Sequence, residues 1–178
     1  MLSCMSNYRR FRISGGTFFF TVVTAARSRS VLTDHADLLR QAYRATASEL
    51  PFATDAIVIL PDHMHAVWTL PQGDSDFPER WRRIKARFSH ALGKRYPRSA
   101  SKHAKREVGL WQRRYWEHAI RDDRDYRMHV EYCWANPVRH GLVAAAMDWE
   151  LSSIHRDHRA GRVPNGWSSP KFDGAFGE

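Results

Sequence analysis

The first half of the chain contains three short runs of apolar residues with the character of strands. Residues 17–24 are aromatic and β-branched and predict a buried strand. Residues 56–60 and 63–70 predict two more strands. Only Pro61 and Asp62 separate these two. Because so short a link cannot carry a crossover, the pair is expected to form an antiparallel hairpin.

Two segments between and after these strands show the spacing of amphipathic helices. Residues 34–48 repeat apolar side chains on one face, and Asp34 is expected to cap this helix. Residues 77–92 predict a second helix, whose basic side chains point away from its apolar stripe. That stripe consists of Trp81, Ile84, Phe88 and Leu92.

The second half of the chain predicts fewer elements. Residues 93–109 are polar, basic and rich in small residues, which is typical of a loop. Residues 115–120 predict a fourth strand, and a third helix is expected to start at Asp122 or Asp123 and end near Asn136-Pro137. Residues 149–178 contain glycine and proline and little periodicity, so an extended tail is predicted there.

The order of elements is strand, helix, strand, strand, helix, strand, helix. This order matches an α+β, ferredoxin-like antiparallel sheet of the split βαβ type with one added helix. We therefore expect one domain over residues 1–148, followed by a C-terminal tail over residues 149–178.

Composition adds a local excess of positive charge to this picture. The chain is 43% apolar and carries a formal charge of +9, as a basic globular protein would. Residues 80–115 hold thirteen of the 28 Lys and Arg residues and one of the 19 acidic ones. A localised basic block favours a nucleic-acid partner over a merely solvated surface. We find no signal peptide or membrane span and expect a cytoplasmic protein.

His63 and His65 form the first candidate site. Side chains alternate along a strand, so the two imidazoles project from the same face and are able to share one metal ion. A His-x-His pair is by itself also compatible with two ordinary histidines in a strand.

The third helix supplies a second candidate group. On a helical wheel, a core stripe is formed by Tyr126, Val130, Cys133 and Pro137. Tyr132 lies off this stripe, one turn before Asn136 and on a polar strip with His129. A tyrosine outside the stripe favours a functional role, although packing at the edge of the stripe stays open.

Five blocks in this order resemble the HUH single-strand transposases with one catalytic tyrosine, and in particular the REP-associated tyrosine transposases. The blocks are Tyr8-Arg9-Arg10 with residues 15–21, residues 60–65 with 68–71, residues 111–121, Tyr132 with residues 136–143, and Trp149 with Ser152, Ser153, His155 and Arg156. The resemblance covers nearly the whole chain.

The resemblance implies a metal-dependent nuclease and strand-transferase that cuts single-stranded DNA. It implies Tyr132 as the nucleophile and His63, His65 and Asn136 as ligands of Mg²⁺ or Mn²⁺. It further implies REP-type DNA hairpins as substrate and a 5′-phosphotyrosyl intermediate. Candidate DNA contacts are Arg82, Arg83, Lys85, Arg87, Arg113, Arg114, His155 and Arg156.

Two other functions remain open at this point. A catalytically silent DNA-binding protein would bind hairpins without cutting them. A metal hydrolase that uses water would cut without a tyrosyl adduct. The chain is expected to act as a monomer or a homodimer.

Overall fold

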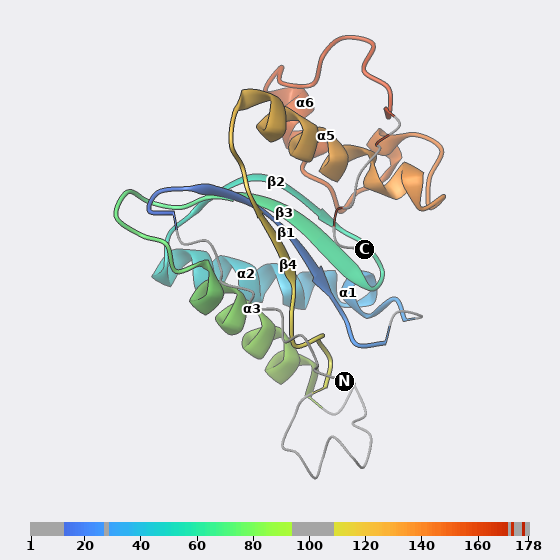
Figure 1. Cartoon of the computed structure of the whole chain (residues 1–178). Helices are drawn as coiled ribbons and strands as arrows, with labels where there is room; N and C mark the ends of the chain where they lie inside the picture. Colours follow the sequence, from blue (N-terminus) through green and yellow to red (C-terminus); the bar gives the residue numbers. More distant parts are fainter. Residues whose placement is uncertain (1–12, 27–28, 94–108, 171, 173–175, 177–178) are drawn as a thin grey trace, which may run out of the picture.

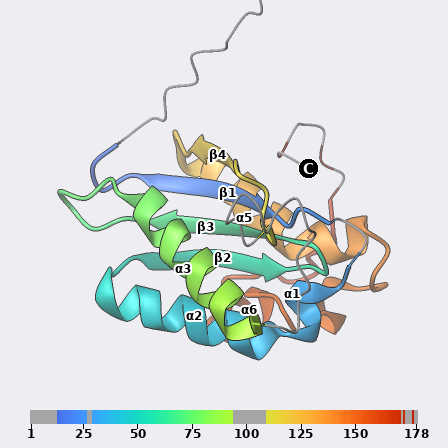
Figure 2. The same cartoon turned by 90° about the horizontal axis from the view of Figure 1, so that it is seen from below.

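A single antiparallel sheet forms the centre of the computed structural model (Figures 1 and 2). The structure describes residues 13–26, 29–93, 109–170, 172 and 176. The strands within them are β1 (Thr17–Val23), β2 (Ala53–Ile59), β3 (His63–Thr69) and β4 (Trp116–Ala119). They lie in the order β2-β3-β1-β4, which is the order of a ferredoxin-like sheet. All three strand pairings are antiparallel, which confirms the predicted plan.

Helices cover both faces of this sheet. The helices are α1 (Val31–Asp34), α2 (Ala36–Glu49), α3 (Phe77–Leu92), α5 (Asp123–Arg139) and α6 (Ile154–Arg159), with a 3₁₀ turn η2 (Ala146–Asp148). In Figure 1, α2 and α3 lie on one face, and α5 and α6 lie on the other. None of the helices among the described residues is long and apolar enough to cross a membrane.

The predicted hairpin between β2 and β3 is confirmed. The backbone N–H of Leu60 donates to the carbonyl of His63 across the turn, at 2.8 Å. Pro61 and Asp62 form the link, which fixes the register of β3. Register decides which β3 side chains face each layer of helices.

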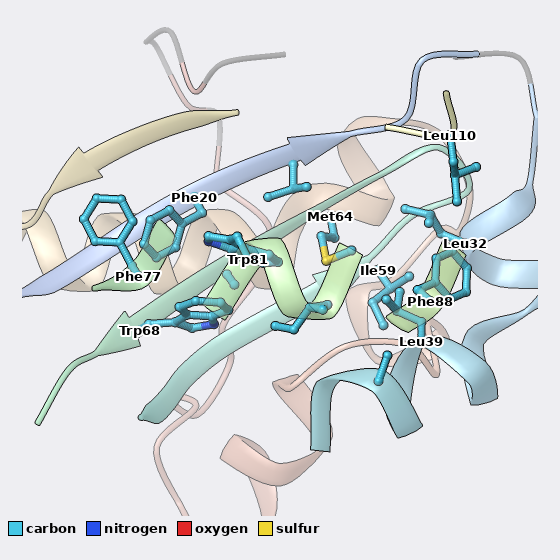
Figure 3. Packing of buried hydrophobic residues seen from close by; sticks show 14 of the residues in the cluster. Phe20, Leu32, Leu39, Ile59, Met64, Trp68, Phe77, Trp81, Phe88 and Leu110 are labelled. Carbon is cyan, nitrogen blue, oxygen red and sulfur yellow. The ribbon is translucent and has the colours of Figure 1, made fainter. Parts of the chain in front are cut away.

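The core between the sheet and α2/α3 is built from the predicted apolar stripe. Trp81 of α3 stacks on Trp68 of β3 with ring centroids 4.2 Å apart (Figure 3). Phe20 of β1 and Phe77 of α3 pack beside them at 5.2 Å. Asp76 caps α3 by accepting from the Glu79 N–H, which satisfies one donor of the first turn.

A second core lies between the sheet and α5. Phe19 of β1 and Val67 of β3 point into it, because they alternate with the residues that face α2 and α3. From α5 it receives Val130 and Cys133 of the predicted stripe, and also Tyr132. Burial strongly raises the pKa of the Cys133 thiol, which keeps this side chain protonated and inert.

The expected cap at Asp34 is wrong. Asp34 ends the short helix α1, and its carboxylate accepts a hydrogen bond from the Ser30 hydroxyl at 2.6 Å. His35 occupies the N-cap position of α2 and makes no side-chain cap bond. The chain turns earlier than predicted because Val31 and Leu32 bury their side chains in the core.

The third predicted helix, α5, extends past Pro137 to Arg139. Proline removes one N–H, but in the last turn this costs a single helical bond. The backbone N–H groups of His140 and Leu142 donate to the carbonyls of Asn136 and Pro137 at 3.0 and 2.9 Å, and so complete the end of the helix.

Residues 149–170 do not form the extended tail that was predicted, because α6 lies within them. Their backbone pairs with the outer edge of β2: Ile59 N–H donates to Leu151 O at 2.9 Å, and Ser153 N–H to Ile57 O at 2.8 Å. Pairing covers an edge that would otherwise expose its polar groups. Periodicity could not predict this pairing, since backbone bonds between distant segments need no repeating side-chain pattern.

Candidate active site

His63 and His65 lie side by side on the face of β3 that α5 covers. Their ring centroids are 5.0 Å apart. His65 is fully buried and His63 nearly so. The predicted juxtaposition of the two imidazoles is therefore present, and it follows from the two-residue period of the strand.

Hydrogen bonds fix the orientation of both imidazole rings. His63 Nδ1 lies 2.7 Å from the carboxylate of Asp62, which only accepts, so Nδ1 carries the hydrogen. His65 Nδ1 lies 2.9 Å from Thr21 Oγ1. The Thr21 hydroxyl donates its own hydrogen to the Phe176 carbonyl, so Oγ1 accepts from His65 Nδ1.

In the neutral form of each ring, these bonds leave Nε2 as the unprotonated nitrogen. A metal-ligating histidine usually donates its other N–H to a carboxylate or hydroxyl partner, and both rings do so. The donor set therefore fits a divalent ion held through the two Nε2 atoms.

Helix α5 brings Tyr132 to this pair of imidazoles. The ring of Tyr132 lies 5.2 Å from that of His65, centroid to centroid. Asn136 is buried one turn further along the same helix. His65 and Tyr132, which are 67 positions apart in the chain, thus lie beside each other on one face of the sheet. Asn136 follows Tyr132 by one turn, as the i and i+4 spacing on α5 predicted.

The wheel prediction for Tyr132 is wrong in one respect, because its side chain is fully buried. The sheet covers one side of α5 and a C-terminal segment covers another, so the buried face is wider than the predicted stripe. Phe176 stacks on the Tyr132 ring at 3.8 Å, and Phe172 contacts the ring edge-on at 5.3 Å. In this conformation no DNA phosphate reaches the phenol.

Two other polar side chains lie at the same place. The guanidinium carbon of Arg139 is 5.0 Å from the centre of the Tyr132 ring. The ring of His140 lies 5.0 Å from that of His63. The sequence alone predicted no role for either residue. Their position just after the Asn136-Pro137 motif was the only sequence feature that pointed to a role.

His129 shares the polar strip of α5 with Tyr132, as predicted, and it also is buried. Burial lowers the pKa of His129, and the nearby His118 adds to this effect, although Asp125 opposes it. The imidazole is therefore neutral at pH 7. His129, His118 and Asp125 bring three potential ligand atoms within 4.8 Å of one another.

Three of the arginines predicted to contact DNA pair with glutamates of α3 and α2. Arg82 and Arg83 both donate to Glu79, and these hydrogen bonds lower the pKa of that carboxyl to about 2. Arg83 and Arg87 also reach Glu49 on α2. Three of the predicted basic residues are thus engaged within the protein.

Lys85 and Arg113, with Arg82, line a surface groove of about 460 Å³ beside Trp81 and Tyr115. The Lys85 ammonium lies 5.6 Å from the rings of both Trp111 and Tyr115 and donates to the Gln112 carbonyl. Arg114, next to Arg113, is exposed.

His155 and Arg156 are held inside the C-terminal segment. His155 Nε2 lies 2.9 Å from the Trp149 carbonyl. The guanidinium of Arg156 donates to the carbonyls of Thr54 and Asp55. Arg156 therefore fastens this segment to β2, whereas the His155 bond lies within the segment, and these hydrogen bonds do not bring either side chain to Tyr132.

Comparison with known proteins identifies the family. A family model described as "Transposase IS200 like" matches residues 16–136, a range that contains all four predicted active-site residues. The chain belongs to the IS200-like transposase family. Within the family it is 45% identical to the REP-associated tyrosine transposase of Escherichia coli strain K12, over 98% of either chain.

Two further comparisons agree with this placement in the IS200-like family. A putative REP-associated tyrosine transposase from Haemophilus influenzae is 45% identical over 92% of this chain and 93% of its own. A solved structure of a REP-associated tyrosine transposase bound to a REP hairpin superposes with a TM-score of 0.87, at 45% identity and 98% coverage of both chains. The resemblance seen in the sequence is confirmed, and so is the ferredoxin-like fold.

Proposed function

We propose that this transposase cleaves and rejoins single-stranded DNA next to REP-type hairpins, with Tyr132 as the nucleophile. The single observation that supports this most is the placement of the Tyr132 ring 5.2 Å from that of His65, on a fold shared with a relative bound to a REP hairpin. Family membership makes DNA cleavage the expected chemistry.

The proposed step is an in-line attack of the Tyr132 oxygen on a backbone phosphorus. The new bond joins the phenol oxygen to the 5′ phosphate, and the bond from phosphorus to the 3′ oxygen breaks. The phenol loses its proton and the leaving oxygen gains one, giving a 3′-hydroxyl. Because the adduct retains the phosphoester, attack by another 3′-hydroxyl reverses the step and joins strands.

Other residues around Tyr132 would bind the metal ion, add positive charge or uncover the tyrosine. His63 and His65 present their Nε2 atoms and, with Asn136, would hold Mg²⁺ or Mn²⁺. Such an ion withdraws negative charge from the nonbridging oxygens of the phosphate when bound. Arg139 adds a second positive charge beside the tyrosine. Phe176 must leave the Tyr132 ring before DNA enters.

One chain supplies one tyrosine and therefore one cut at a time. A monomer is sufficient for one round of cleavage and rejoining, whereas two simultaneous cuts need a homodimer. The mass of the protein–DNA complex in solution, on a substrate with two sites, distinguishes the two cases.

The test uses a single-stranded REP hairpin labelled at its 3′ end and incubated with Mn²⁺ or Mg²⁺. We expect a labelled covalent band on a denaturing gel with the wild type and none with Tyr132→Phe, a loss of at least about 10³-fold. Tyr126→Phe, earlier on the same helix, is the matched control and should keep the band.

Each of the two alternative functions predicts a different result in this experiment. Cleaved DNA without a covalent band indicates water as the nucleophile. Hairpin binding without cleavage by the wild type, in either metal, indicates a silent DNA-binding protein. A covalent band that persists in Tyr132→Phe overturns the assignment of the nucleophile.

A further inference from the structure

Three potential ligands meet where β4 approaches the start of α5, near the proposed active site but separate from its residues. We call them the His118 cluster: His118 of β4 with Asp125 and His129 of α5. One ligand atom from each lies within 4.8 Å of the other two. Asp125 and His129 are one helical turn apart, so both project toward the same strand.

The contacts in the His118 cluster all converge on one aspartate. His118 Nε2 lies 2.8 Å from Asp125 Oδ2. His129 Nδ1 lies 3.1 Å from Asp125 Oδ1 and 2.8 Å from its backbone carbonyl. The two imidazole rings stack at 4.7 Å with their planes 17° apart. Two imidazolium ions would repel each other in this arrangement, so at least one ring is neutral.

Burial makes the carboxylate of this cluster energetically unfavourable unless a ligand binds it. The side chains of Asp125 and His129 are 4% and 3% exposed. Because the His129 Nδ1 hydrogen bonds the backbone carbonyl, Asp125 Oδ1 has no hydrogen-bond donor among the described residues. A buried carboxylate oxygen without a donor is unfavourable. His118 is 24% exposed, so a small ion has a path to the cluster from solvent.

Capping of α5 explains only part of the His118 cluster. The N–H of Arg121 donates to Asp125 Oδ2 at 3.0 Å, as is common for an acidic residue in a first turn. The helix already has its own N-cap, because Asp122 accepts from the Asp125 N–H at 2.8 Å. Capping therefore accounts neither for Oδ1 nor for a second buried imidazole beside it.

We propose that the His118 cluster binds one Zn²⁺-class transition metal ion, distinct from the ion at His63 and His65. Two imidazoles and one carboxylate suit Zn²⁺, and a water completes a tetrahedron through the exposed side of His118. Ligand atoms of such a tetrahedron are about 3.3 Å apart. Binding requires His118 Nε2 and Asp125 Oδ2, which are 2.8 Å apart, to open to that value. It also requires the His129 ring to turn out of its stack on His118 and present Nε2, because Nδ1 donates to the backbone carbonyl of Asp125.

The bound ion would fasten β4 to the helix that carries Tyr132. β4 is an edge strand of the sheet and pairs only with β1 among the described strands. Phe19 packs between the two sites, 4.7 Å from the His129 ring and 5.8 Å from that of Tyr132. Metal at the His118 cluster therefore stabilises the wall of the active site without entering the reaction, and its binding does not depend on the proposed function.

The test measures binding of ZnCl₂ to the full chain by calorimetric titration. His63→Ala/His65→Ala removes the other site and should leave one equivalent of tight binding. Adding His118→Gln should weaken this binding at least about 10-fold, because one of three protein ligands is removed. His158→Gln, an exposed histidine on α6, is the control and should change nothing.

Thermal unfolding gives a second readout that needs no activity. Saturating ZnCl₂ should raise the Tm of His63→Ala/His65→Ala by several degrees, and a chelator should reverse the rise. No tight equivalent in this variant overturns the proposal. Binding that survives both His118→Gln and His129→Gln also overturns it, because the ion then lies elsewhere. Since His118 is partly exposed, its variant tests the site without a large cavity in the core.

Discussion

At the scale of single residues, each of the two imidazoles of the proposed metal site has a hydrogen-bond partner. The sequence could reveal one of these partners but not the other. The spacing of His63 and His65 was sufficient to place both on one face of a strand. Asp62 is adjacent to His63, but Thr21 lies 44 positions from His65. Local patterns cannot identify such a partner, because strand pairing alone brings it into contact.

Replacing Thr21 tests whether this orientation matters. Thr21→Val keeps the shape of the side chain and removes the acceptor for His65 Nδ1–H. We expect the affinity for Mn²⁺ to fall about 10- to 100-fold, as for other hydrogen-bond partners of metal-binding histidines. Calorimetric titration measures it, and Thr17→Val on the same strand should bind like the wild type. Unchanged affinity in Thr21→Val would show that the hydroxyl does not orient the ring.

At the scale of elements, α5 shows the limit of periodicity. The helical wheel placed Val130 and Cys133 in the core, and both side chains are buried as expected. The wheel placed Tyr132 outside the core because it assumes that only one face of the helix is covered by the rest of the protein. The C-terminal segment adds a second cover, through Phe172 and Phe176. Since that segment has no repeating apolar pattern, its packing could not be predicted.

Removing the Phe176 ring should expose Tyr132, the proposed nucleophile. Phe176→Ala deletes the ring that stacks on Tyr132, so DNA reaches the phenol more often. We expect covalent adduct to form several-fold faster, about 1 kcal/mol of barrier per fivefold. Initial rates on the 3′-labelled hairpin measure this. Val163→Ala, in the same segment, serves as control. A rate equal to or below that of the wild type would contradict the role of Phe176 as a cover.

Asp157 fastens α6 to α5 and predicts a dependence of stability on pH. Burial raises the pKa of Asp157, but hydrogen bonds from Arg156, Arg162 and Trp134 outweigh it and leave the pKa low. The folded state is therefore stabilised above the unfolded pKa of about 3.9. This contribution decreases as pH falls below that value through the folded pKa.

Urea unfolding at pH 7, 4 and 3 tests the role of Asp157. The wild type should lose stability below pH 4 more steeply than Asp157→Asn. At pH 7 the variant should be less stable by about 1–3 kcal/mol, since the buried Trp134 N–H loses its ionised acceptor. Asp37→Asn on the surface of α2 is the control. Parallel pH profiles for wild type and Asp157→Asn would contradict the assigned pKa.

At the scale of the whole molecule, the basic block of residues 80–115 divides into two parts. The sequence predicted the block and its preference for nucleic acid, but not which cations serve the fold. Arg87 pairs with Glu49 across α2 and α3, whereas Lys85 and Arg113 line the groove beside Tyr115. Residues 94–108, most of the predicted basic loop, lie outside the described residues.

Two variants separate these roles. Lys85→Ala/Arg113→Ala should weaken hairpin binding and reduce the slope of log affinity against log salt by about 1 for each phosphate that is no longer bound. Arg87→Ala should instead lower stability by about 1 kcal/mol, because the hydrogen bond to the buried Thr46 hydroxyl is removed, and should leave that slope unchanged. Binding at several salt concentrations and urea unfolding measure both effects. If the salt slope is reduced in Arg87→Ala but not in Lys85→Ala/Arg113→Ala, Arg87 contacts DNA and the two roles are reversed.

Whether Tyr132 itself forms the bond to DNA can be determined by mass spectrometry of the trapped adduct. The wild type is allowed to cleave a REP hairpin with Mn²⁺ and is then digested with nuclease and protease. We predict a nucleotide attached to the peptide that contains Tyr132. A nucleotide on any other of the six tyrosines, or cleaved DNA with no modified peptide, would contradict the assignment.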